Sequence, residues 1–238
     1  MLTGIDDLLT KSKPDLLLVQ GDTVTVMAAA LAAFYHKVPV GHVEAGLRTT
    51  DRYNPFPEEM SRRQTGRLAT LHFAPTPRAV ENLRREGVTE HVYMTGNTVI
   101  DALEETVTRL ARTPLSPKLI DELFAKVDFD NKRVLLVTAH RRENWGEPMK
   151  NIAQALKQIA DQFPDVQILY PIHRNPVVRE SVEPVFNGHA QLTLIEPLDY
   201  VPLVYAMQRC FFVLTDSGGI QEEAPTLGKP VLILRKFV

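Results

Sequence analysis

The sequence predicts an α/β protein made of two Rossmann-like domains. Short apolar runs alternate with amphipathic helical patterns, and this alternation is typical of βαβ units with a parallel sheet. Polar turns, several of them rich in glycine, follow the apolar runs. The alternation pauses once, at Thr95-Gly96-Asn97, and then begins again. We therefore predict an N-terminal domain over residues 1–97 and a C-terminal domain over residues 98–238.

The first domain begins with a helix rather than a strand. Apolar spacing and breaker residues predict helices at 2–12, 28–35, 58–68 and 77–86 and strands at 16–19, 39–43, 71–74 and 91–94. Because no strand precedes the first helix, we expect this domain to be a partial Rossmann-like unit. The second domain is fuller, with strands predicted at 132–137, 166–170, 191–194, 211–214 and 231–234 and helices at 98–112, 116–127, 147–162, 176–186, 200–208 and 218–226.

Composition narrows the class of protein. The chain has 238 residues, is 44% apolar and carries a formal net charge of −2, so we expect no bulk attraction to nucleic acid or to an acidic membrane. The single cysteine, Cys210, cannot form an internal disulfide and fits a reducing compartment. The apolar runs are too short to span a bilayer, and the first residues lack a signal-peptide pattern. We expect a cytoplasmic protein.

A Ser-Gly-Gly turn near the C-terminus is the strongest candidate for a ligand site. Asp216 or Ser217 can cap the helix that follows, and Gly218 and Gly219 allow the backbone to approach a ligand closely. The N–H groups at a helix N-terminus favour a phosphate. Glu223, farther along the helix, is placed to accept hydrogen bonds from ribose hydroxyls. The alternative interpretation is an ordinary helix cap without a ligand.

Carboxylates collect at strand and helix ends of the first domain. Ligands of open α/β sheets bind outside the carboxyl ends of the strands, where Asp22 and Glu44 are expected. Glu58 and Glu59 begin the next helix. Structural alternatives remain open: Asp22 could cap a helix, Glu44 could pair with Arg48, and the two helix-start glutamates suit the helix dipole.

Two histidines follow strands of the second domain. His140 stands beside Arg141 and could belong to a solvated charge run, while His173 could be a buried core histidine. Carboxylates and an imidazole around one cleft are a general acid/base arrangement. The histidines are scattered, without a His-x-x-x-His or cysteine pair, so we expect no metal.

Several motifs run along the chain in a fixed order: Gly21-Asp22-Thr23, His42-Val43-Glu44-Ala45-Gly46-Leu47-Arg48-Thr49, Asn54-Pro55-Phe56-Pro57-Glu58-Glu59, Thr95-Gly96-Asn97-Thr98, His140-Arg141-Arg142-Glu143-Asn144 and Asp216-Ser217-Gly218-Gly219-Ile220-Gln221-Glu222-Glu223-Ala224-Pro225. Together they resemble the non-hydrolysing UDP-N-acetylglucosamine 2-epimerases. The resemblance implies two domains of the glycosyltransferase-B type with UDP in a shared cleft. It also implies a homodimer that supplies cell-envelope polysaccharide synthesis.

The resemblance further implies a reaction and residue roles. UDP-N-acetylglucosamine and UDP-N-acetylmannosamine would interconvert by elimination and re-addition of UDP through 2-acetamidoglucal, without a cofactor. The implied acid/base group is Asp22, Glu44 and Glu58, with His140 at the diphosphate. The implied UDP contacts are His140, Ser217, Gly218, Gly219 and Glu223. Arg141 and His173 resemble residues that line a second, activating UDP-N-acetylglucosamine site.

The sequence departs from the family at both ends. Family members begin with a strand and a glycine- and arginine-rich phosphate loop, and they continue past residue 234 with an arginine-bearing loop and a helix. One alternative is therefore a truncated, inactive UDP-sugar-binding remnant. A hydrolysing epimerase and a glycosyltransferase of the same fold are further alternatives, although glycosyl transfer does not need acid/base groups around C2.

Overall fold

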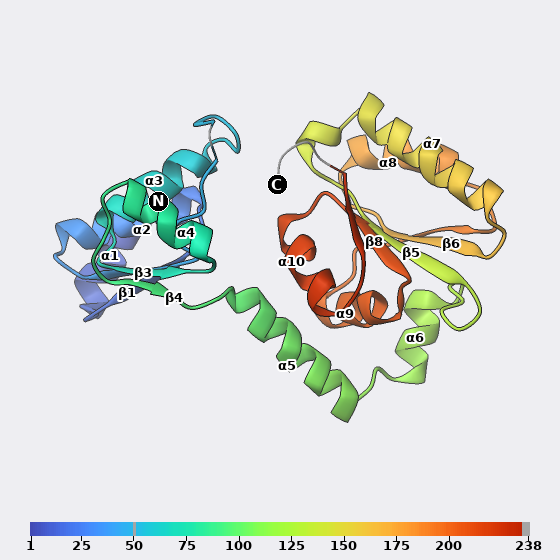
Figure 1. Cartoon of the computed structure of the whole chain (residues 1–238), viewed down its shortest axis with the longest axis horizontal. Helices are drawn as coiled ribbons and strands as arrows, with labels where there is room; N and C mark the ends of the chain where they lie inside the picture. Colours follow the sequence, from blue (N-terminus) through green and yellow to red (C-terminus); the bar gives the residue numbers. More distant parts are fainter. Residues whose placement is uncertain (50, 235–238) are drawn as a thin grey trace. The chain divides into compact units, whose positions relative to one another are not determined.

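The computed structural model describes residues 1–49 and 51–234. The chain divides into two compact units, Met1–Thr98 and Val99–Val238, and each has its own parallel sheet (Figure 1). Both units alternate strands with helices, so the predicted α/β class with two Rossmann-like units is confirmed.

The N-terminal unit has a four-stranded parallel sheet in the order β1-β2-β3-β4. Its strands are β1 (Leu17–Gln20), β2 (Val40–Val43), β3 (Leu71–Ala74) and β4 (Val92–Met94). Since neighbouring strands are parallel and consecutive in the chain, the ends of β1 and β2 meet at one edge of the sheet. That edge carries the turns after Gln20 and Val43.

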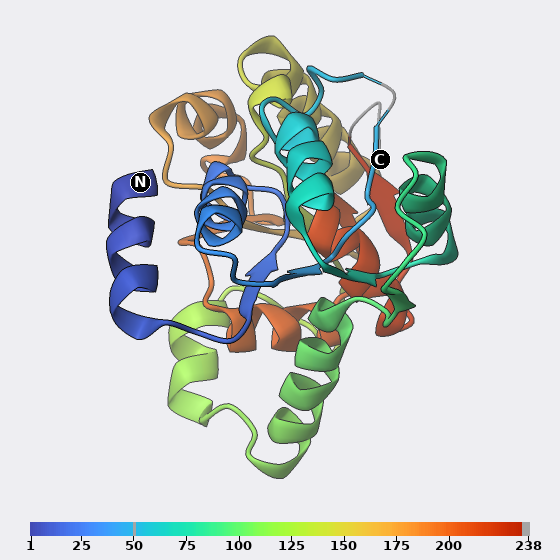
Figure 2. The same cartoon turned by 90° about the vertical axis from the view of Figure 1, so that its left-hand side faces the viewer.

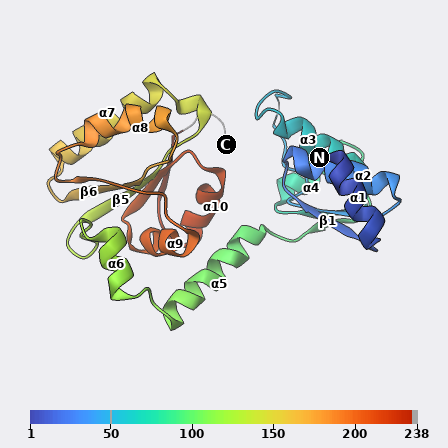
Figure 3. The same cartoon turned by 180° about the vertical axis from the view of Figure 1, so that it is seen from behind.

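The helices of this unit are α1 (Leu2–Ser12), α2 (Val24–Tyr35), α3 (Glu58–Leu68) and α4 (Pro77–Arg85). The sequence placed the start of α2 at Ala28, and the structure corrects this start to Val24. The reason is Thr23, whose hydroxyl accepts a hydrogen bond from the Val26 N–H at 3.3 Å and so caps the helix. α1 packs against α2, as Figures 2 and 3 show.

The helices of the N-terminal unit lie on one side of its sheet in Figure 1. Leu9 and Ala30 join Val19 and Val40 in one apolar cluster, and α4 contributes to a second cluster beside β3. On the other face of the sheet, the side chains of Leu18 and Tyr93 are exposed. Among the described residues, this sheet therefore has a packed face and an open apolar face.

The C-terminal unit has a five-stranded parallel sheet in the order β7-β6-β5-β8-β9. Its strands are β5 (Arg133–Thr138), β6 (Val166–Pro171), β7 (Leu192–Ile195), β8 (Phe212–Thr215) and β9 (Val231–Ile233). Its helices are α5 (Thr98–Arg112), α6 (Pro117–Phe124), α7 (Glu147–Gln162), α8 (Pro176–Phe186), α9 (Tyr200–Arg209) and α10 (Gly218–Thr226). A 3₁₀ turn, η1 (Arg142–Asn144), follows β5.

Helices cover both faces of this second sheet. Leu135 and Val137 of β5 face a cluster with α7 and α8, while Val134 and Leu136 face a cluster with α5, α9 and α10. Figure 3 shows α7 and α8 on one side of the strands and α9 on the other. Strands buried on both faces read as continuous apolar runs, which is why the sequence located them well. No helix in the described part of the chain is long and apolar enough to cross a membrane.

Candidate functional site

Asp22 lies directly after β1, at the carboxyl edge of the N-terminal sheet. Its Oδ2 accepts from Arg62 Nη2 at 2.7 Å and from Arg62 Nε at 2.9 Å. The capping role that the sequence left open for Asp22 belongs to Thr23 instead. Arg62 was not among the predicted residues, because it reaches Asp22 from α3, forty positions away in the chain.

Glu44 follows β2 at the same edge and has a left-handed backbone, with φ of 67°. Its Oε2 lies 3.5 Å from the position that a Cβ on Gly21 would occupy, so the carboxylate rests against the turn that carries Asp22. Arg48, the alternative partner of Glu44, forms a bidentate pair with Glu86, with both N–O distances at 2.8 Å. The structure therefore brings Asp22 and Glu44 to one edge.

The two glutamates at the start of α3 have different environments. Glu59 is fully buried and accepts from the Thr49 N–H at 3.0 Å, from Arg63 Nε at 2.8 Å and from Arg62 Nη1 at 3.4 Å. Glu58 is half-buried and lies one turn before Arg62 on the same helix. Glu59 therefore anchors the loop before α3. Glu58 has a half-buried carboxylate one helical turn from Arg62, the residue that pairs with Asp22.

The Ser-Gly-Gly turn of the C-terminal unit lies at a topological switch point. β5 is the central strand between β6 and β8, so the connections leaving β5 and β8 run to different sides of the sheet. The strand ends are joined by a hydrogen bond of 2.6 Å between the hydroxyls of Thr138 and Thr215, and the Ser217 N–H donates to Thr215 Oγ1 at 2.9 Å. Open α/β sheets bind ligands at such points.

Asp216 organises this switch point and was considered only as a helix cap in the sequence. Its side chain is completely buried and accepts from the N–H groups of His140 at 2.9 Å and Arg141 at 2.8 Å. It also accepts from Asn144 Nδ2 at 2.9 Å. Ser217 occupies the cap position of α10, but its side chain makes no capping hydrogen bond, so the expected side-chain cap is wrong for Ser217.

His140 and His173 lie together, although the sequence assigned them to different sites. Their rings stack with centroids 5.4 Å apart and planes 16° from parallel. Burial lowers the pKa of His140, with Asp216 opposing this shift and His173 adding to it, so the imidazole is neutral near pH 7. His173 is exposed rather than a core histidine, and its Nδ1 accepts from the Asn175 N–H at 3.1 Å.

Glu223 is buried beneath the first turn of α10. Its Oε1 lies 3.5 Å from the Cβ position of Gly219, and its Oε2 accepts from the Tyr200 hydroxyl at 3.0 Å. Burial raises the pKa of the Glu223 carboxyl, and burial together with Glu223 raises the pKa of Tyr200 to about 12. The side chain of Glu223 therefore points back to the turn that contains Gly218 and Gly219.

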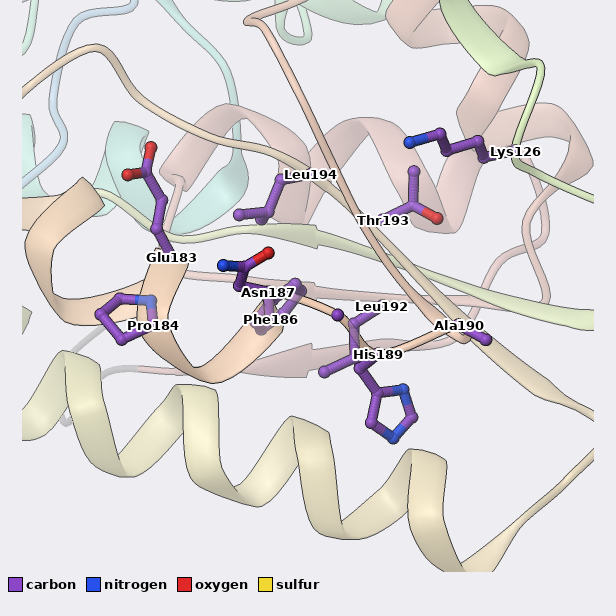
Figure 4. Close-up of a pocket in the computed structure, with 11 residues that line it drawn as sticks. Lys126, Glu183, Pro184, Phe186, Asn187, His189, Ala190, Leu192, Thr193 and Leu194 are labelled. Atoms are coloured by element: carbon purple, nitrogen blue, oxygen red, sulfur yellow. The ribbon is translucent and has the colours of Figure 1, made fainter.

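A separate pocket of about 800 Å³ lies at the β7 edge of the C-terminal sheet (Figure 4). Phe186 and Leu192 line it, together with Lys126 and His189. His189 Nε2 is 2.9 Å from Asp161 Oδ1. None of the predicted site residues lines this pocket. Within residues 1–49 and 51–234, no group of three or more histidine, cysteine, aspartate or glutamate side chains is arranged to hold a metal ion.

Rossmann-like units with a glycine turn at a switch point are typical of nucleotide-binding α/β proteins. The family model described as UDP-N-acetylglucosamine 2-epimerase matches residues 1–237. The chain belongs to this family, and the resemblance inferred from its motifs is confirmed.

Named relatives support the same assignment. The UDP-N-acetylglucosamine 2-epimerase of Yersinia pestis is 51% identical over 236 residues, which are 99% of this chain and 62% of the relative. That of Bacillus subtilis is 49% identical over 235 residues, which are 98% of this chain and 59% of the relative. The chain therefore spans about three fifths of the length of the curated relatives it matches.

Solved structures agree with this result. The crystal structure of UDP-GlcNAc 2-epimerase from Neisseria meningitidis bound to UDP-GlcNAc matches with a TM-score of 0.93 and 47% identity, over 99% of this chain and 63% of that one. The S. aureus MnaA–UDP co-structure matches with a TM-score of 0.90 and 47% identity, over 99% of this chain and 62% of that one.

Proposed function

We propose that this protein interconverts UDP-N-acetylglucosamine and UDP-N-acetylmannosamine. The observation that carries the proposal is the placement of Asp22 and Glu44 at one sheet edge, in a chain that belongs to this family. A relative with 47% identity has been crystallised with UDP-GlcNAc, and another with UDP. These ligands are the substrate and the leaving group of the proposed reaction.

The proposed chemistry proceeds by elimination and re-addition. A carboxylate removes the C2 proton, the C1–O bond breaks, and its electron pair leaves with the β-phosphate oxygen of UDP. The C2–H electron pair forms the C1=C2 double bond of 2-acetamidoglucal. A carboxylic acid then returns a proton to the opposite face of C2 while UDP re-adds at C1. Asp22, Glu44 and Glu58 supply these acids and bases.

The C-terminal unit is proposed to hold UDP. The backbone at Ser217, Gly218 and Gly219 presents N–H groups at the start of α10, where a helix favours a diphosphate. His140, whose pKa is lowered, is proposed to donate a hydrogen bond to the diphosphate as a neutral imidazole. Glu223 accepts from the ribose hydroxyls, in exchange for part of its contact with Tyr200.

The proposal is tested by incubating the protein with UDP-N-acetylglucosamine in D₂O and following the sugar by proton NMR. We expect UDP-N-acetylmannosamine to accumulate and deuterium to replace hydrogen at C2 of both epimers. Free N-acetylmannosamine would indicate a hydrolysing enzyme instead. UDP binding in calorimetry without either product or deuterium exchange would establish the inactive, UDP-sugar-binding alternative.

Two further parts of the proposal concern association and regulation. A homodimer is proposed from the family, and sedimentation equilibrium measures it directly. Arg141 and His173 are proposed to contact a second UDP-N-acetylglucosamine. Because His173 stacks on His140, a ligand that contacts His173 at the second site would act on His140, the residue proposed to contact the diphosphate, through one ring contact. An H173A variant with hyperbolic rather than sigmoidal substrate dependence would support this role.

A further inference from the structure

His42 of β2 is buried in the N-terminal sheet, and its side chain is tied to the turn that carries Asp22. The residue is 1% exposed, and its Nε2 lies 2.8 Å from the Gly21 carbonyl oxygen. A carbonyl can only accept a hydrogen bond, so Nε2 must carry the proton. Nδ1 is buried and has no hydrogen-bond partner among the described residues. The contacts therefore select the neutral tautomer with its N–H at Nε2.

The Gly21 turn is fixed on both sides of its backbone. Its N–H donates to the Val43 carbonyl at 3.0 Å, and its own carbonyl accepts from His42. Gly21 has φ of +80°, a left-handed backbone conformation that residues other than glycine rarely adopt. Asp22 is the next residue, and the Glu44 carboxylate rests 3.5 Å from the Cβ position of Gly21. Gly21 thus lies between the backbone of Asp22 and the carboxylate of Glu44.

We propose that His42 is a positioning residue, which fixes the Gly21 turn and thereby the separation of the Asp22 and Glu44 carboxylates. This inference rests on the proposed acid/base roles of the two residues. The ring of His42 donates its one hydrogen bond to the Gly21 carbonyl and makes none to either carboxylate, so its effect passes through the Gly21 turn. Proton transfer at C2 requires each carboxylate to lie within hydrogen-bond reach of the same carbon, so a shift of the turn changes the rate of chemistry.

His72 provides a matched control on the neighbouring strand. It is the cross-strand partner of His42, is 2% exposed, and also has a buried Nδ1 without a hydrogen-bond partner in the described part of the chain. It makes no described contact with the Gly21 turn. Removing either imidazole costs packing in the same sheet, but only the His42 change releases the turn.

The experiment compares H42L, H42Q and H72L in the full chain. Leucine removes the donor, whereas the glutamine amide N–H can reach the Gly21 carbonyl from the same backbone position. We expect H42L to lower kcat by about 10- to 100-fold, since a displacement of about 1 Å can have this effect. We expect H42Q to recover most of the rate and H72L to retain it, with KM and the Kd for UDP unchanged in all three.

A second readout does not depend on turnover. In protein with ¹³C-labelled carboxyl groups, H42L is expected to shift the NMR titration midpoints of Asp22 and Glu44, and H72L is not. Equal kcat losses in H42L and H72L, or unchanged Asp22 and Glu44 midpoints in a folded H42L protein, would overturn the inference. If the wild-type protein shows no turnover, the proposed function fails, while the carboxyl titrations still decide whether His42 positions the two acids.

Discussion

The two sheets of this protein differ in how they are enclosed. The C-terminal sheet has five strands with helices packed on both faces, and the fully buried Asp216 joins its strand-end turns by hydrogen bonds. The N-terminal sheet has four strands, and its open face carries Leu18 at 60% exposure and Tyr93 at 48%. In this unit Asp22 pairs with Arg62, and the buried His42 donates to the carbonyl of Gly21, the residue before Asp22.

The difference separates two ways of building a site. The C-terminal unit presents backbone N–H groups and a neutral imidazole. These hydrogen-bond donors suit an anion such as a diphosphate, whose charge does not change during proton transfer at C2. The N-terminal unit presents the Asp22 carboxylate, which pairs with Arg62, and Arg62 also pairs with Glu59. Carboxylates in such a place suit the proposed proton transfer. Substitutions in the N-terminal unit should therefore change the chemical step, and substitutions in the C-terminal unit should change UDP affinity.

The largest expected effect comes from the acids themselves. D22N and E44Q each remove a proposed proton-transfer group without changing side-chain shape, and general acid–base catalysis contributes about 10²- to 10⁴-fold. We expect kcat to fall by about that factor while the Kd for UDP stays within about twofold of wild type. E81Q, which alters only the surface pair of Glu81 with Arg85, is the control. Loss of UDP affinity in D22N or E44Q would make these residues binding groups instead.

The next largest effect is expected at Asp216. D216N replaces a carboxylate oxygen with an amide that faces the N–H groups of His140 and Arg141. Disturbing a buried hydrogen bond costs about 1–3 kcal/mol, so UDP affinity should fall about tenfold and Tm should decrease. D130N, at an exposed pair with Arg209, should change neither quantity. Calorimetry and thermal unfolding measure both effects, and unchanged UDP affinity in D216N would remove Asp216 from the site.

The N-terminal unit should also respond more strongly to acid. Burial lowers the pKa of His42 and lowers that of His72 to about 4. The unfolded state then binds more protons than the folded state below the ordinary histidine pKa of about 6.5. Stability is therefore complete above about pH 6.5 and declines as the pH falls toward about 4.

This acid response is measurable by hydrogen exchange of the two units between pH 7 and pH 4. Amides of β2 and β3 should lose protection faster than those of β5 and β6, after correction for the intrinsic exchange rate. H72L should weaken the pH dependence. Equal losses in both sheets would contradict a special role for the buried histidines.

The smallest effect is expected from Y200F. The variant removes the hydroxyl that donates to Glu223, and because this hydrogen bond lowers the Glu223 pKa, its loss raises that pKa further. A single hydrogen bond contributes about 0.5–1.5 kcal/mol, so UDP affinity should change by about 2- to 10-fold and kcat should not change. Y205F, in the same helix but without this contact, is the control. An altered kcat in Y200F would show that the effect extends beyond UDP binding.

The sequence predicted the fold class because buried parallel strands read as apolar runs and their turns contain glycine. It also placed Asp22 and Glu44 at strand ends, where β1 and β2 bring them together. It missed Arg62, because the pairing with Asp22 depends on how α3 packs.

Other errors have the same origin in tertiary contacts. Asp216 was considered a local cap, but its hydrogen-bond partners lie 72 to 76 positions earlier in the chain. For His173 a core position was left open as an alternative, but the structure leaves the residue exposed, with its Nδ1 accepting from the Asn175 N–H. The start of α2 was missed because the Thr23 side chain caps the helix one turn before Ala28. Local patterns locate strand ends, and long-range contacts decide what each side chain does there.

The most direct test compares wild-type protein and E44Q with UDP-N-acetylglucosamine in D₂O, with UDP affinity measured on the same samples. The account predicts deuterium at C2 and the manno epimer from the wild type, and neither from E44Q, with equal Kd values for UDP. A wild-type protein that binds UDP but leaves C2 protonated, or an E44Q variant that exchanges C2 at the wild-type rate, would contradict it.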